Sequence, residues 1–131
     1  MLTYEQITNI FNEDAMVKLL DIKILTAKPG YAETSLQLTE KHLNSVGITH
    51  GAVLFALADV TMAAAGNAHG VKALALNASI NFLKPSTKGE ILYAYAKEDN
   101  LTKKTGVYRV EIYNENKEMI AVVEGTLYRM N

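Results

Sequence analysis

Hydrophobic and polar residues follow a helical period at the start of this chain. Within residues 3–20, three apolar residues recur at the spacing of one helix face. These are Ile7, Ile10 and Phe11. Thr3 can cap the first turn, with Gln6 as its capping-box partner. The pattern therefore predicts one amphipathic helix over 3–20.

A period of two follows and predicts strands. Apolar residues share one face over 20–24 and again over 32–38, on either side of a turn at Pro29-Gly30. After residue 70 the chain is almost entirely strand by the same criterion. The predicted segments are 71–83, 90–98, 106–113 and 118–129. The polar run 114–117 (Asn-Glu-Asn-Lys) predicts the hairpin turn between the last two.

Between these groups lies an alanine-rich segment, 52–66, which is apolar on every face and follows a polar loop at 39–49. A helix that is apolar all round has to be buried all round. Hairpin-length connections favour an antiparallel sheet, so we expect a curved sheet wrapped around this helix, an α+β fold. The 131 residues suffice for a single domain, 1–131. The remaining sheet face would be covered by a partner subunit.

The segment 71–83 has two different faces. The apolar face carries Leu74, Leu76, Ala78, Ile80 and Phe82. The opposite face is small and polar, with Ala73, Ala75, Asn77, Ser79 and Asn81. We interpret the polar residues of that face as a seam of cross-strand hydrogen bonds at a dimer interface, in preference to direct contact with a substrate.

Composition excludes several classes of function. The net charge is −1, with 13 basic and 14 acidic residues, so nothing favours nucleic-acid binding. The chain has no cysteine, and therefore no disulfide and no thiolate nucleophile. The first residues lack the pattern of a signal peptide, and no apolar stretch reaches the roughly 20 residues that span a membrane. We expect a cytoplasmic protein with no membrane partner.

Asp59 stands alone among apolar and small residues of the 52–66 helix. Burying a carboxylate costs several kcal/mol unless it is paired or protonated. Asp59 therefore has one of two roles. It is a structural residue that faces solvent or is hydrogen-bonded by its neighbours, or it is the acid of a functional site. Gly51, near the first turn of the helix, offers backbone N–H groups and the positive end of the helix dipole to an oxyanion.

Gly51 and Asp59 are eight residues apart, which corresponds to about 12 Å along a helix axis. Catalytic groups have to lie within about 3 Å of their targets. If both residues act on one carbonyl, they come from different chains. A two-fold dimer with antiparallel central helices would supply this arrangement twice.

The sequence resembles the PaaI-like branch of the hotdog-fold thioesterases. The central motif is carried by His42, Asn44, Gly47, His50, Gly51, Ala52, Leu57, Ala58 and Asp59. Weaker similarity continues through 80–85, Gly89, 104–108 and 125–126, and covers nearly all of the chain from residue 20 onward. Many relatives have a second glycine where this chain has Ala52, so we expect a shift in geometry there.

The resemblance implies a hotdog fold, a dimer or dimer of dimers, and hydrolysis of acyl-coenzyme A thioesters. Asp59 would be the general base or the nucleophile, and the Gly51 N–H would polarise the carbonyl. Asn44 would position water or the acyl group, and His50 would orient the thioester. The candidate substrate-binding residues are Asn77, Ser79, Asn81, Lys84, Pro85 and Lys104. No metal or other cofactor is implied beyond the coenzyme A of the substrate.

Other interpretations remain open at this point. His42 fits a surface or loop-bracing role better than a catalytic one, and the three histidines lack metal-binding spacing. The alternatives to hydrolysis are a hotdog hydratase, whose His/Asp or His/Glu hydration motif is absent, an acyl-CoA sensor without turnover, and a structural protein. The acyl group itself, aryl-acetyl, hydroxybenzoyl-like or medium-chain, is not determined by the sequence.

Overall fold

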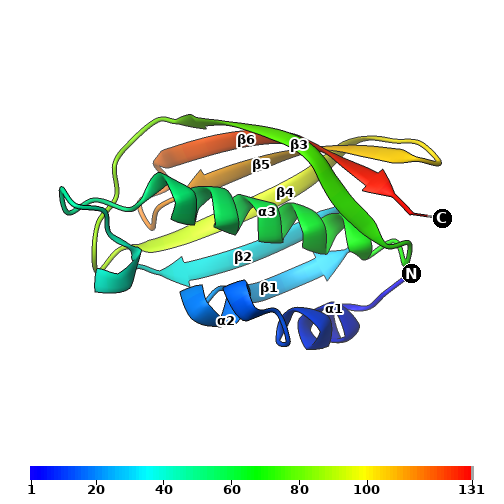
Figure 1. Ribbon diagram of the computed structural model, residues 1–131, viewed down its shortest axis with the longest axis horizontal. Coiled ribbons are helices and arrows are strands. Elements are labelled where there is room, and N and C mark those ends of the chain that lie inside the picture. Colours follow the sequence, from blue (N-terminus) through cyan, green and yellow to red (C-terminus); the bar gives the residue numbers. More distant parts are fainter. Residues whose placement is uncertain (131) are drawn as a thin grey trace.

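The computed structural model describes residues 1–130, in which a curved antiparallel sheet wraps around one long helix, α3 (Gly51–Asn67) (Figure 1). The strand order is β1-β2-β4-β5-β6-β3. The strands are β1 (Lys23–Lys28), β2 (Tyr31–Gln37), β3 (Ala73–Phe82), β4 (Ile91–Leu101), β5 (Thr105–Tyr113) and β6 (Met119–Arg129). The predicted α+β arrangement of a sheet around a central helix is confirmed, with strand ends shifted by a few residues.

The N-terminal segment forms two helices, which corrects the prediction of one helix over 3–20. The two helices are α1 (Tyr4–Phe11) and α2 (Ala15–Leu20). The capping box at Thr3 is present as predicted. The break follows from Asp14, whose carboxylate accepts hydrogen bonds from the N–H groups of Met16 and Val17 and so starts a new helix.

The sheet and α3 enclose one apolar core. Its largest buried side chains include Ile7, Leu36, Leu57, Met62, Leu92 and Ile112. A buried polar link fixes the rotation of α3 over the sheet. The Thr61 hydroxyl donates to the Leu57 carbonyl at 2.7 Å, so it accepts from the Thr34 hydroxyl, also at 2.7 Å. This link determines which side of α3 faces outward.

The prediction that α3 is buried on every side is wrong for the single chain. Ala52 and Asp59 are exposed, and Phe55, Ala56 and Ala63 are only half-buried. Their spacing of three or four residues places them along one side of the helix. We call this side the open stripe. It exists because the sheet curves around only part of the helix circumference.

β3 forms one edge of the sheet and contains a bulge. The register shifts between Ala75 and Asn77 and leaves Leu76 as an extra residue. The bulge moves Leu74 onto the face that carries Asn77, so the prediction of a continuous apolar face through Leu74 and Ile80 is wrong. Leu74 and Leu76 are 58% and 62% exposed. An exposed apolar edge strand is a surface that favours pairing with another chain.

Candidate active site

The N-terminus of α3 presents a backbone N–H group without an acceptor. His50 caps the helix: its Nδ1 accepts from the Ala52 N–H at 3.2 Å, and its carbonyl accepts from Val53 at 2.9 Å and from Leu54 at 3.3 Å. Among residues 1–130, no hydrogen-bond acceptor is in range of the Gly51 N–H. This amide, at the positive end of the helix dipole, can therefore bind an oxyanion.

Gly51 lines a surface cavity of about 440 Å³, which we call the Gly51 cavity. The candidates that also line it are Asn44, Lys84 and Pro85. The Phe82 side chain covers the glycine so closely that a Cβ added at Gly51 would lie 3.1 Å from Phe82 Cζ. Glycine at this position therefore leaves room for the ring and for a ligand beside the free amide.

The loop that leads into α3 is held by its own polar groups. The Asn44 Oδ1 accepts from the N–H groups of Val46 at 3.0 Å and Ile48 at 3.2 Å. The Thr49 N–H donates to the Ser86 carbonyl at 2.8 Å, and the Ser86 hydroxyl donates to Thr49 Oγ1 at 2.8 Å. Because the Asn44 oxygen is engaged in the loop, its NH₂ group is the part that can reach a ligand in the cavity.

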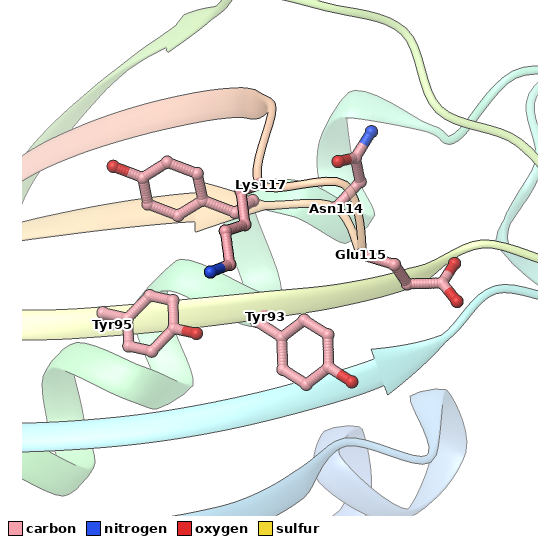
Figure 2. Close-up of a pocket in the computed structure, with 6 residues that line it drawn as sticks. Tyr93, Tyr95, Asn114, Glu115 and Lys117 are labelled. Atoms are coloured by element: carbon pink, nitrogen blue, oxygen red, sulfur yellow. The ribbon is translucent and has the colours of Figure 1, made fainter.

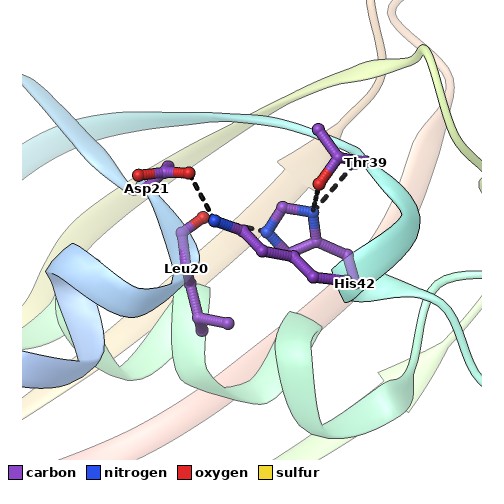
Figure 3. Close-up of polar contacts among 5 residues, drawn as sticks. Leu20, Asp21, Thr39 and His42 are labelled. Atoms are coloured by element: carbon purple, nitrogen blue, oxygen red, sulfur yellow. Dashed lines mark hydrogen bonds and ion pairs between the residues drawn. The ribbon is translucent and has the colours of Figure 1, made fainter.

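His42 braces this loop from below. It belongs to the 3₁₀ turn Glu40–His42 and is fully buried (Figure 3). Its Nδ1 accepts from the Thr39 N–H at 2.9 Å, so its Nε2 carries the hydrogen and donates to the Leu20 carbonyl at 2.9 Å. His42 therefore ties the end of α2 to the loop before α3, and it does not line the Gly51 cavity.

We expect His42→Ala to lower the free energy of unfolding by about 3 kcal/mol, because it leaves a cavity and removes the partners of the Thr39 N–H and the buried Leu20 carbonyl. Chemical denaturation of both proteins measures this loss. Lys41→Ala, an exposed neighbour, is the control and should change stability by less than about 1 kcal/mol. Equal losses in the two variants would contradict the bracing role.

Asp59 lies on the open stripe, about two turns beyond Gly51. Its carboxyl is exposed in the single chain and has no hydrogen-bond partner among residues 1–130. Neighbouring protein atoms nevertheless displace part of its water, and this desolvation raises the pKa of Asp59; the nearby Asp14 charge raises it further. An unpaired carboxylate with a raised pKa is suited to accept a proton.

A second cavity, of about 500 Å³, lies on the same side of α3. We call it the Asp14 groove, because Asp14 lines it together with Ala63, one helical turn beyond Asp59. Asp59 does not line the Gly51 cavity. Asp59 itself lines neither hollow, and within one chain it stays apart from the free amide, as their separation along the helix predicts.

The other candidate residues are dispersed. Lys84 pairs with Glu118, and this hydrogen-bonded ion pair lowers the pKa of Glu118. Lys104 lies in the turn between β4 and β5, with its ammonium 6.0 Å from the centre of the Tyr128 ring, and lines neither cavity. The polar residues of β3 face outward on the edge strand and also line neither cavity. They are Asn77, Ser79 and Asn81.

A third cavity, of about 310 Å³, lies on the sheet face opposite α3 (Figure 2). Three tyrosines line it with residues of the β5–β6 turn: Tyr93, Tyr95, Tyr113, Asn114, Glu115 and Lys117. None of these belongs to the central motif, and Glu115 already accepts from the Ile91 N–H at 3.0 Å. The free amide and the desolvated carboxylate, both on the α3 side, make that side the better candidate.

Sequence reasoning missed two residues of the site. Phe82 was assigned to an apolar strand face, but it covers Gly51. Asp14, treated as part of a continuous helix, contributes a second carboxylate near Asp59. The acidic residue before a hydrophobic run was a usable helix-start signal at Asp14. Within residues 1–130, no three His, Asp or Glu side chains gather as metal ligands, and no helix has the length and apolarity to span a membrane.

The chain is similar to known thioesterases over most of its length. Residues 46–121 match the family model described as the thioesterase superfamily. Acyl-coenzyme A thioesterase PaaI of Escherichia coli K12 is 36% identical over 92% of this chain and 86% of its own length. A candidate esterase of Archaeoglobus fulgidus is 42% identical over 93% of this chain and 79% of its own.

Solved structures agree with this assignment. The structure of Escherichia coli PaaI superimposes with a TM-score of 0.91 at 35% identity, covering 94% of this chain and 89% of that one. A protein of Thermus thermophilus gives a TM-score of 0.86 at 36% identity, covering 90% and 99%. The chain therefore belongs to the thioesterase superfamily, as a PaaI-like hotdog-fold thioester hydrolase.

Proposed function

We propose that the protein hydrolyses acyl-coenzyme A thioesters at sites shared between two subunits. The observation that carries this proposal is the free Gly51 N–H at the start of α3, together with an unpaired, desolvated Asp59 on the same helix. The similarity to Escherichia coli PaaI, whose name gives acyl-coenzyme A as its substrate, supports the substrate class.

In the proposed reaction, the Gly51 N–H binds the thioester oxygen and stabilises the negative charge that develops on it. The Asp59 carboxylate takes a proton from water while the water oxygen attacks the carbonyl carbon. The tetrahedral intermediate then collapses, the carbon–sulfur bond breaks, and the coenzyme A thiolate leaves and takes up a proton. In the nucleophilic variant, Asp59 attacks the carbon itself, and water later hydrolyses the mixed anhydride.

Two other residues have supporting roles in this proposal. The Asn44 NH₂ group, free of the loop contacts that engage its oxygen, positions water or the acyl group. Since His50 Nδ1 accepts the Ala52 N–H, its Nε2 carries the hydrogen and can orient the thioester. In this proposal no metal or further cofactor takes part. Lys84, which lines the Gly51 cavity, would contact a phosphate of coenzyme A.

The proposed partner is a second copy of this chain, and a dimer of dimers is compatible with it. The exposed edge of β3 and the open stripe of α3 lie on the surface that such a copy would cover. Antiparallel α3 helices would bring Gly51 of one subunit to Asp59 of the other. We place this enzyme in the cytoplasm, in line with the expectation from its sequence.

Release of free thiol from a panel of acyl-CoA thioesters tests the activity. We expect turnover of at least one aryl-acyl or medium-chain thioester. Tight binding without thiol release would instead support an acyl-CoA sensor, and addition of water to an enoyl-CoA would support a hydratase. Either result would overturn the proposed hydrolysis.

Mixed dimers test the shared site. We expect chains with Asp59→Asn and chains with Gly51→Pro to be inactive alone, and to regain activity when they are unfolded and refolded together. Random pairing makes about half of the dimers mixed, and each mixed dimer has one intact site of two. Activity should therefore return to about a quarter of the wild-type value. Mixed dimers that form but stay inactive would contradict the shared site.

A further inference from the structure

The Asp14 groove has mainly apolar walls and lies along α3 beyond Asp59, which does not itself line it. Ala63, one turn beyond Asp59, forms part of its helix wall, and Asn67 continues that wall by another turn. The facing apolar residues come from α1 and from the segment just before β3. They are Ile10, Phe11 and Val71. A volume of about 500 Å³ is within the usual range of small-molecule sites.

The end of the groove near Asp59 carries a second carboxylate. Asp14 is half-buried and close enough to Asp59 for their charges to repel each other. Its position is fixed, because one carboxylate oxygen caps α2 through bonds of 2.9 Å to the Met16 N–H and 3.1 Å to the Val17 N–H. Lys72 also lines the groove, and it follows the C-terminal end of α3, which lies about 12 Å beyond Asp59 along the helix axis.

A thioester carbonyl carries two substituents, the acyl chain and the sulfur of coenzyme A. When the carbonyl is bound at Asp59, these two extend in different directions. One direction leads to the Gly51 cavity of the second subunit, which the coenzyme enters in the proposed function and whose lining includes Lys84. The other leads into the Asp14 groove, which is apolar but acidic at its entrance. An uncharged acyl group fits these surroundings, whereas a terminal carboxylate held near Asp14 would be repelled.

We propose that the Asp14 groove receives the acyl group and that Asp14 is a specificity-determining residue that rejects acyl groups ending in a carboxylate. This inference rests on the proposed function, since the acyl group reaches the groove only if the thioester carbonyl is bound at Asp59. The substrate class is therefore a coenzyme A thioester of an uncharged, mainly apolar acid.

Two five-carbon thioesters, pentanoyl-CoA and glutaryl-CoA, test the inference, because they differ by a terminal carboxylate. Wild type should prefer pentanoyl-CoA by kcat/KM. Asp14→Asn should narrow this preference by about fivefold, since it removes one charge at the entrance. Asparagine still caps α2, so the fold is preserved. The preference is a ratio of two kcat/KM values measured at one pH, so a change in the ionisation of Asp59 between variants cancels from it.

Asp21→Asn is the matched control. Asp21 lies at the other end of α2, in a left-handed conformation that asparagine adopts readily, and it pairs with Lys41. The same loss of charge there should leave the preference unchanged. Asp14→Ser, which also caps a helix, is a second variant and should act as Asp14→Asn does.

The outcomes separate the two proposals. If wild type hydrolyses neither these two thioesters nor any in the panel, the proposed function fails. If wild type hydrolyses them and both Asp14 variants keep its preference, the function stands and the role of Asp14 is overturned. A wild type that prefers glutaryl-CoA would also overturn that role.

Discussion

Asp59→Asn should reduce kcat for acyl-CoA hydrolysis by about 10³-fold, with little change in KM. Asparagine has the size of aspartate but cannot take a proton from water or attack the carbonyl. The Asp59 carboxyl has no hydrogen-bond partner within residues 1–130, so the substitution breaks no internal contact. Steady-state release of free thiol from the best substrate of the panel measures the effect.

Two comparisons make this result specific. Asp21→Asn removes the same charge from a distant exposed position and should keep full activity. The thermal midpoint of Asp59→Asn should equal or exceed that of wild type, because a poorly solvated charge is removed. Equal turnover by Asp59→Asn and wild type would show that another group supplies the base.

The same chemistry predicts the acid side of the pH profile. As the proposed base, Asp59 has to be a carboxylate, and both desolvation and the Asp14 charge raise its pKa above the usual value of an aspartate. As pH falls, kcat/KM should therefore decline at a higher pH than for an aspartate with an ordinary pKa. Asp14→Asn should move this decline toward lower pH.

Gly51→Pro should reduce kcat by about a hundredfold, because it removes the N–H that we propose binds the developing oxyanion. Proline is well tolerated at the first position of a helix. The preceding residue, His50, has φ −62° and ψ 133°, an extended conformation that a following proline accepts. The helix should therefore form normally. The substitution removes only the N–H of residue 51, which is the amide of the first turn that has no acceptor.

Gly51→Ala separates this effect from crowding. Its Cβ would meet the Phe82 ring, as the proline ring does, but the N–H remains. We expect Gly51→Ala to lose less than about tenfold in kcat, since the oxyanion contact is kept. Losses of equal size in the two variants would mean that the position of Phe82, and not the amide, limits the reaction.

The order of elements and the family could be predicted from the sequence because both depend on local patterns. Alternating residues predicted the strands, and the motif around Asn44, Gly51 and Asp59 predicted the family that the comparisons confirm. Ala52, in place of a second glycine, still gives its N–H to His50 Nδ1. The helix start is therefore intact without that glycine.

Local patterns did not predict features that depend on which surfaces meet. The bulge at Leu76 exchanged the faces of β3, because register is fixed by pairing with β6 and not by β3 alone. The helix over 3–20 was interrupted because Asp14 satisfies two backbone N–H groups, a local alternative that competes with continuing the helix.

Asp59 shows most clearly which properties the sequence determined and which the tertiary structure determined. By itself, the sequence determined that a lone carboxylate stands eight residues after Gly51 on one helix, a separation that chain geometry makes too long for a common target. Only the tertiary structure decided that the Gly51 N–H has no acceptor, that Phe82 covers it and that Asp14 lies near Asp59. These properties arise from contacts between segments distant in sequence, which no local pattern encodes.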